Sequence, residues 1–176
     1  DENYNVIKDE GYGFVHDDQI AWYEKKAAEL KAENGGKAVP SLLFQHIPVL
    51  QEYNKLTEVS EGTPGAVERN GKFYIAEEGA ILDGSLGEGP CPPDKIGSQF
   101  ESWKKTGDIV AAFFGHDHKN TFTMDVDGIK LVQTHGAGYH TYGCQRGGRR
   151  IVIDENKPDT YESELLFVDR ITDGEI

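Results

Sequence analysis

The sequence predicts a layered α/β fold in which a mixed sheet is flanked by helices. Two units lead to this prediction, because each combines a helical stretch with a short apolar run that ends beside a histidine. The apolar runs are 39–46 and 109–114. Repeated helix–strand units favour a layered α/β architecture. A third segment, 121–134, alternates in polarity around a two-residue turn and adds an antiparallel hairpin.

The first helix is expected over 18–32. Asp17 or Asp18 can cap its N-terminus, and 34–36, Asn-Gly-Gly, ends it. The apolar residues at helical spacing on one face are Ile20, Tyr23, Ala27 and Leu30. The polar, glycine-bearing residues 1–14 are typical of a loop or a frayed end.

The first strand is expected over 39–46, where Pro48 then prevents it from continuing. Residues 49–93 lose all periodicity and hold four of the seven prolines, with only 72–75 resembling a short strand. This stretch is therefore expected to be a long irregular loop, far beyond the usual connection of about 4–6 residues. It either forms a wall of a substrate crevice or is a surface insertion.

The second helix is expected over 94–106, with Ile96, Phe100 and Trp103 on its core face and Gly107 as its C-cap. The strand 109–114 follows. Its uncharged, aromatic-rich sequence is typical of a strand that is buried on both faces.

The remaining chain is expected to be mostly antiparallel. Strands at 121–126 and 129–134 surround Asp127-Gly128, a strong signal for a two-residue hairpin. Two more short strands are expected at 149–154 and 162–169.

Three histidines follow the two apolar strands and are the candidate metal ligands: His46, His116 and His118. In open α/β sheets ligands bind beyond the carboxyl ends of the strands. Neutral imidazoles at such an edge suit Zn, Fe, Mn or Ni. The alternative is a solvated turn that happens to hold histidines. The other histidines are not expected to bind metal: His16 is expected at the surface, and His135 and His140 are expected to be structural or substrate-facing.

Composition narrows the classes of partner. The 176 residues amount to one domain, and a net charge of −13 with a pI near 4.8 disfavours nucleic acid and anionic membranes. No segment approaches the ~20 apolar residues of a membrane span. Cys91 and Cys144 can form one bridge or stay as two free thiols. The sequence leaves localisation open, including secretion or the cell envelope.

The histidine motifs resemble a known family. Phe44-Gln45-His46-Ile47-Pro48, followed much later by Gly115-His116-Asp117-His118, is similar to the last two motifs of the calcineurin-like metallophosphoesterases. The downstream glycine-rich run 136–143 and Arg149-Arg150 are similar to the purple-acid-phosphatase-like branch. The similarity extends from about Gln19 to about Ile153.

This resemblance implies a C-terminal half of a layered metallophosphoesterase α/β sandwich. In that family two divalent cations, Fe, Mn or Zn, lie about 3.5–4 Å apart and activate a water for attack on a phosphate ester. By the family pattern His46 and His116 would bind one ion and His118 the other. The upstream Asp-x-His, Gly-Asp-x-x and Gly-Asn-His-Asp/Glu motifs, which hold the remaining ligands and the proton donor, do not occur in this sequence.

Two functional hypotheses follow. The first is a metal-dependent phosphoesterase to which this chain contributes its histidine motifs, with a phosphomonoester, a diester or a nucleotide as substrate. Its partners would be that substrate and the missing N-terminal half of the same domain, without which the chain is expected to be inactive and able to self-associate. The second is a non-catalytic remnant or binding domain that keeps the fold with a weak or empty metal site.

Overall fold

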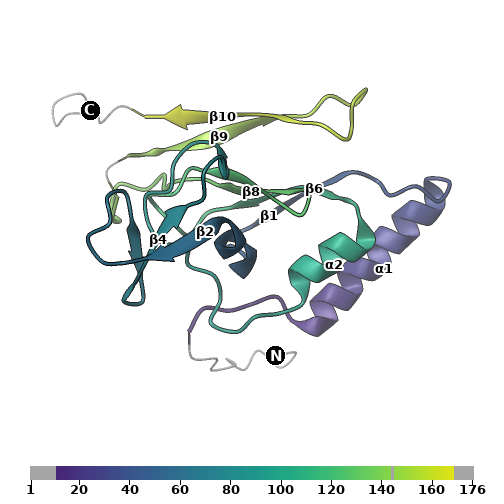
Figure 1. Cartoon of the computed structure of the whole chain (residues 1–176). Helices are drawn as coiled ribbons and strands as arrows, with labels where there is room; N and C mark the ends of the chain where they lie inside the picture. Colours follow the sequence, from purple (N-terminus) through teal and green to yellow (C-terminus); the bar gives the residue numbers. More distant parts are fainter. Residues whose placement is uncertain (1–10, 144, 169–176) are drawn as a thin grey trace.

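A computed structural model describes residues 11–143 and 145–168 of the chain (Figure 1). Its central feature is a five-stranded sheet in the order β1-β6-β8-β7-β5. These strands are β1 (Ser41–Gln45), β6 (Ile109–Phe114), β8 (Ile129–Gln133), β7 (Thr123–Val126) and β5 (Ile81–Asp83). β1, β6 and β8 are parallel, whereas β7 runs antiparallel to both of its neighbours. The predicted mixed sheet with flanking helices is therefore confirmed.

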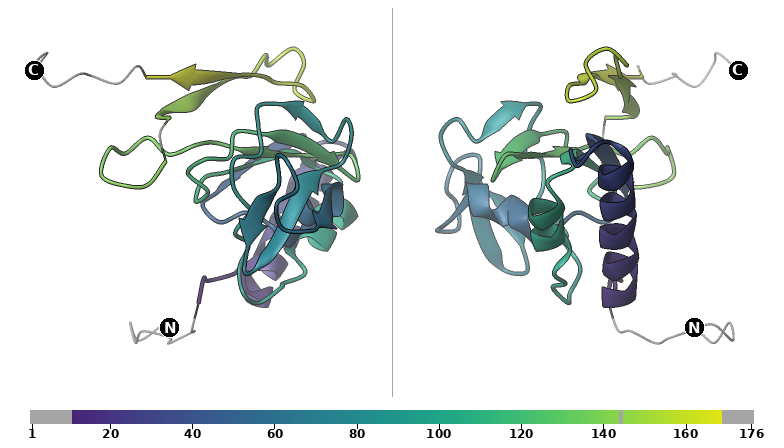
Figure 2. Two further views of the ribbon diagram at one scale, coloured as in Figure 1. Left: turned by 60° about the vertical axis from the view of Figure 1, so that its left-hand side comes forward. Right: turned by 90° about the vertical axis from the view of Figure 1, so that its right-hand side faces the viewer.

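Two helices, α1 (Asp17–Glu33) and α2 (Gln99–Thr106), lie side by side on one face of this sheet (Figures 1 and 2). Phe100 and Trp103 of α2 are almost fully buried there. They pack in one apolar cluster with residues of the sheet that include Ile109, Ala112 and Phe114. This face holds the larger part of the core.

The other face of the sheet is covered by a separate two-stranded antiparallel sheet of β9 (Gly147–Val152) and β10 (Glu162–Phe167), which gives a layered arrangement (Figure 2). Ala111 and Phe113 point to this side, where Ile151 and Tyr161 pack against them. The strand 109–114 is thus buried on both faces, as its sequence predicts. Of the second predicted segment, 162–169, residue 169 lies outside the described residues.

The second helix is shorter than expected, because it begins at Gln99 rather than at Asp94. The Asp94 carboxylate accepts a hydrogen bond from the Tyr12 backbone N–H at 3.0 Å and so holds the N-terminal segment instead of capping a helix. A Cβ at Gly97 would lie only 3.1 Å from the Val15 carbonyl oxygen, so 93–98 packs closely on that segment. Ile96, expected on the core face of the helix, is 67% exposed. At the other end of the helix, Gly107 is the C-cap as expected and has the left-handed conformation.

The first helix begins at Asp17 with His16 as its N-cap, so Asp17 and Asp18 lie in the first turn instead of capping it. Their charges there favour the positive end of the helix dipole. The His16 backbone N–H donates to Gln19 Oε1 at 2.9 Å. Of the predicted apolar face, Ile20 is buried but Leu30 is 45% exposed.

The expectation of a long irregular loop at 49–93 is wrong. This segment holds a 3₁₀ helix, η1 (Leu50–Lys55), and a three-stranded antiparallel sheet in the order β2-β4-β3. Its strands are β2 (Leu56–Val59), β4 (Lys72–Ala76) and β3 (Val67–Arg69). Strands of three to five residues are too short to show a periodicity, and Asn70-Gly71, both with positive φ, makes the tight turn between β3 and β4.

The hairpin at Asp127-Gly128 is confirmed, because both turn residues have positive φ and Val126 pairs with Ile129. β1 lies at one edge of the central sheet, and its Phe44 is 63% exposed. Self-association of the chain through such an exposed edge stays a prediction. No helix among the described residues is long and apolar enough to cross a membrane.

Candidate metal centre

The parallel pairing of β1 with β6 brings His46 and His116 together. Gln45 is in register with Phe114 at the ends of the strands, and the Gly115 backbone N–H donates to the His46 carbonyl oxygen at 3.1 Å. His46 Nε2 and His116 Nδ1 lie 3.3 Å apart, and the two rings meet edge-on with centroids 5.1 Å apart. The histidines expected at neighbouring strand ends are thus side by side.

The backbone at His116 adopts an unusual conformation. Its φ is 67°, and the Asp117 backbone N–H donates to the Gly115 carbonyl oxygen at 2.7 Å across it. A three-residue turn with positive φ is rare, and a left-handed conformation at a residue with a side chain costs about 1–3 kcal/mol. This turn replaces the pleat after β6 and directs the His116 ring toward His46.

The His118 ring has different neighbours. Its Nδ1 lies 2.9 Å from Thr141 Oγ1, and the ring stacks on Tyr142 with centroids 4.2 Å apart. No hydrogen bond between described residues joins this ring to His46 or His116. The two parts of the cluster still interact electrostatically, because the charge of His118 contributes to lowering the pKa of His116.

The His116 imidazole is poised to be neutral. Partial burial lowers its pKa below the ordinary value of 6.5, and the charges of His46 and Arg69 lower it further. A neutral imidazole is the form that binds metal. The separation of the two nitrogens also fits, because ligand atoms about 2.0–2.1 Å from a tetrahedral ion lie about 3.3 Å apart. The pair therefore has the chemistry and the spacing of two ligands to one ion.

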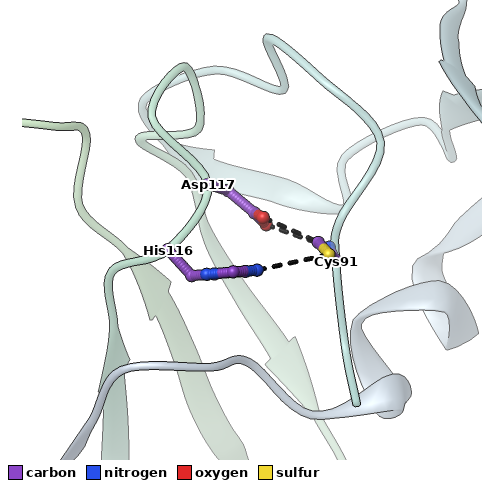
Figure 3. A group of neighbouring side chains, drawn as sticks. All are labelled: Cys91, His116 and Asp117. Carbon is purple, nitrogen blue, oxygen red and sulfur yellow. Dashed lines mark hydrogen bonds between the residues drawn. The ribbon is translucent and has the colours of Figure 1, made fainter. Parts of the chain in front are cut away.

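On its other edge the His116 ring faces a cysteine and an aspartate (Figure 3). His116 Nε2 lies 3.3 Å from Cys91 Sγ, and the Cys91 backbone N–H donates to Asp117 Oδ1 and Oδ2 at 3.2 and 3.3 Å. One donor atom from each of the three residues lies within 4.8 Å of the others. Cys91 has no disulfide partner among the described residues, and Cys144, its candidate partner, lies outside them.

Behind this group a buried polar network holds the Asp117 carboxylate. Asn120 Nδ2 and Gln133 Nε2 donate to Asp117 Oδ2 at 3.2 and 3.1 Å, and Gln133 Nε2 also reaches both Glu52 oxygens at 3.1 Å. Burial raises the pKa of Asp117 to about 7. Burial, followed by the charge of Asp117, raises the pKa of Glu52 well above its ordinary value.

Sequence reasoning missed Cys91, Asp117 and the network of Glu52, Asn120 and Gln133. Asp117 appears as a spacer in a Gly-His-x-His motif, and Cys91 appears only as a candidate for a disulfide. A signal was present in the polar Gln133 at the end of an apolar strand, because such a residue needs a partner when it is buried.

The remaining histidines differ in burial, and the surface position expected for His16 is found. His16 and His140 are exposed, whereas His135 is 3% exposed and stacks on Phe167 with ring centroids 4.9 Å apart. This packing gives His135 a structural place in the interior beside the β9–β10 layer.

Comparison with known proteins adds independent information. The chain is 28% identical over 161 residues to "Probable inactive purple acid phosphatase 14" of Arabidopsis thaliana, a match that covers 86% of this chain and 35% of that protein. Two further Arabidopsis thaliana proteins match similarly. "Probable inactive purple acid phosphatase 29" is 27% identical over 84% of this chain and 35% of its own length. "Probable inactive purple acid phosphatase 28" is 28% identical over 89% of this chain and 35% of its own length.

No family model and no solved structure matches the chain. The chain spans about a third of the length of the curated relatives, so the activity of a whole relative does not transfer to it directly. The matches nevertheless cover 84–89% of this chain. Over most of its length the chain is therefore similar to proteins named as purple acid phosphatases, in agreement with the resemblance of its histidine motifs to that branch of the calcineurin-like metallophosphoesterases.

Proposed function

We propose that this chain provides the histidine side of a two-ion centre that hydrolyses phosphate esters. His46 and His116 would hold one divalent ion and His118 the other. The observation that carries the proposal is the 3.3 Å separation of His46 Nε2 and His116 Nδ1, which suits two ligands of one ion. Fe, Mn and Zn all remain candidates, because a site of nitrogen and oxygen ligands accepts each of them.

The residues of this chain prepare the site in two ways. The strained turn at His116 fixes one ring against His46, and Thr141 Oγ1 holds His118 Nδ1 so that Nε2 is left to act as the ligand. A hydrogen bond to the second ring nitrogen is the usual means of orienting a histidine ligand. Ions bound there would polarise a phosphoryl oxygen and lower the pKa of a bound water.

Two cations lie near the site, although the chain as a whole is acidic and the Glu88 carboxylate accepts a hydrogen bond from the Tyr142 hydroxyl beside His118. Arg69 lies close enough to His116 to lower its pKa, and the Lys119 ammonium lies 5.6 Å from the centroid of the Tyr142 ring beside His118. These cations oppose the repulsion that a net charge of −13 would exert on a phosphate ester.

A second candidate is a non-catalytic domain that retains the fold with a weak or empty metal site. The names of the three relatives favour it, since each is called a probable inactive purple acid phosphatase. The two candidates share the histidine geometry and differ in whether the remaining ligands are present in the complete protein. In this chain the three upstream motifs are absent, so both candidates expect the chain alone to lack turnover.

Nickel titration followed by NMR of the histidine rings tests the shared site. Ni²⁺ is paramagnetic and accepts imidazole ligands. The ring signals of His46, His116 and His118 should broaden together, at a lower Ni²⁺ concentration than the signals of the exposed His16 and His140. Equal broadening of all five exposed or half-buried rings would show that the three histidines form no shared site.

A further inference from the structure

We propose that Cys91, His116 and Asp117 form a separate site for one thiophilic divalent cation of the Zn²⁺ class. This site uses His116 Nε2, whereas the phosphoesterase centre would use Nδ1 of the same ring. The inference does not rest on the proposed function, because it needs only side chains within this chain.

The donor set and its spacing suit such an ion (Figure 3). Thiolate, imidazole and carboxylate are three of the ligand types that zinc takes in proteins. With Zn–S near 2.3 Å and Zn–N near 2.0–2.1 Å, a tetrahedral ion separates its sulfur and nitrogen ligands by about 3.5 Å. The observed separation of Cys91 Sγ and His116 Nε2 is 3.3 Å, and the carboxylate oxygen lies within 4.8 Å of both.

The site is built into the interior rather than assembled on the surface. Cys91 is 5% exposed and Asp117 is 1% exposed. Asn120 and Gln133 hold Asp117 Oδ2 from behind, and Gln133 is itself anchored on Glu52. Hydrogen bonds to a ligating carboxylate are typical of the outer shell of metal sites, where they set the direction of the ligand.

Charge favours a divalent ion that tolerates sulfur. A thiolate and a carboxylate together carry two negative charges, which one divalent ion neutralises while His116 stays neutral. The Arg69 guanidinium contacts Cys91 Sγ and opposes the effect of burial, which raises the pKa of this thiol. Mg²⁺ prefers an all-oxygen octahedron, whereas Zn²⁺ and Cd²⁺ accept sulfur and nitrogen.

Because the His116 ring belongs to both proposed sites, the binding of an ion at one site affects the affinity of the other. An imidazole with one ion on Nε2 can bind a second ion through Nδ1 only after it loses its remaining proton. A thiophilic ion at Cys91 should therefore weaken binding at His46, and removal of the Cys91 thiol should relieve that competition.

Cadmium titration of the reduced chain, residues 1–176, tests the site. The ultraviolet sulfur-to-cadmium charge-transfer band should saturate at one equivalent of Cd²⁺. Cys91→Ser should abolish this band, and Cys144→Ser, which removes the only other thiol, should leave it unchanged. A band that survives Cys91→Ser or disappears with Cys144→Ser would overturn the proposal.

Zinc calorimetry separates this site from the histidine pair. Cys91→Ser should weaken Zn²⁺ binding by about a hundredfold or more and Asp117→Asn by about tenfold or more, because the loss of an outer-shell partner alone costs about 10–100-fold. His46→Ala removes a ligand of the other proposed centre, so the Cys91-dependent Zn²⁺ binding should remain in that variant. Loss of the Cys91-dependent binding in His46→Ala would show that the proposed ligand set is wrong.

A measurement on the wild-type chain covers the case in which Cys91→Ser fails to fold. Alkylation followed by mass spectrometry should show that one equivalent of Zn²⁺ protects Cys91 from modification, whereas Mg²⁺ gives no protection. Equal alkylation of Cys91 with and without Zn²⁺ would contradict the site.

Discussion

At the residue scale, His116 is the position on which both proposed metal sites depend. Its backbone has a positive φ, and its two ring nitrogens face different donors, His46 on one edge and Cys91 on the other. Strain of this kind persists where the surroundings fix it and is concentrated at functional sites. Metal binding requires an imidazole side chain at position 116, whereas the positive φ of the backbone there favours glycine.

A pair of substitutions separates the effect of losing the ring from the effect of the backbone conformation. His116→Ala removes the ring but keeps a Cβ at positive φ, whereas His116→Gly removes both. We expect His116→Gly to be more stable than His116→Ala by about 1 kcal/mol, because glycine adopts this conformation without steric cost. Urea unfolding of both variants measures the difference. Equal stabilities would mean that the turn stores no strain.

His135 gives a pH-dependent prediction away from the metal sites. Burial lowers its pKa below 6.5, so at mildly acidic pH the unfolded chain binds a proton that the folded chain resists. Its contribution to stability is therefore complete above pH 6.5 and is lost as the pH falls below that value.

We expect His135→Phe to reduce the loss of stability between pH 7 and pH 5, as followed by urea unfolding at each pH. The aromatic replacement keeps a ring against Phe167 without a titrating group. His140→Phe, at an exposed histidine, is the matched control and should leave the pH dependence unchanged. A larger loss in His135→Phe than in the wild type would reverse the sign of this account.

At the element scale, the pairing of β1 with β6 delivers the two histidines to one edge, and this could be predicted from the sequence. Both strands are short, apolar and followed by histidine, and the buried run 109–114 leaves little choice of structure. The turn at Asp127-Gly128 could also be predicted, because few other dipeptides tolerate two positive φ values. Local signals of this strength are not overridden by the rest of the fold.

Other elements could not be predicted because distant contacts decide them. Asp94 has the sequence context of a helix start, but its carboxylate binds the Tyr12 backbone 82 residues away. Cys91 reaches His116 through irregular backbone that has no periodicity to read. In 49–93 the sequence indicated only the strand at 72–75, which is β4, and the other short strands escaped detection although Asn70-Gly71 carried a usable hairpin signal.

The hairpin between β7 and β8 can be tested through its turn. Gly128 has φ of 86°, so Gly128→Ala should destabilise the chain by about 1 kcal/mol or more. Gly148, with open space where a Cβ would be, is the matched control, and Gly148→Ala should be near neutral. Thermal unfolding of the two variants compares them. Equal shifts in Tm would show that the positive φ at Gly128 carries no special cost.

At the scale of the whole molecule, the proposed phosphoesterase centre would have only its histidine side in this chain. The purified chain should therefore hydrolyse an aryl phosphate at the background rate with added Mn²⁺ or Zn²⁺, because a two-ion clamp needs ligands that its sequence lacks. A chromogenic phosphatase assay measures this, with His116→Ala as the control. Robust turnover that His116→Ala abolishes would mean that this chain contains a full ligand set.

The central claim is that His46 and His116 bind one ion between Nε2 and Nδ1. The most direct measurement is anomalous diffraction at the zinc edge from Zn²⁺-soaked crystals of the Cys91→Ser variant, in which the competing thiol is absent. The account predicts an anomalous peak about 2.0–2.1 Å from both nitrogens. A map with zinc at other histidines and no peak between these two rings would contradict it.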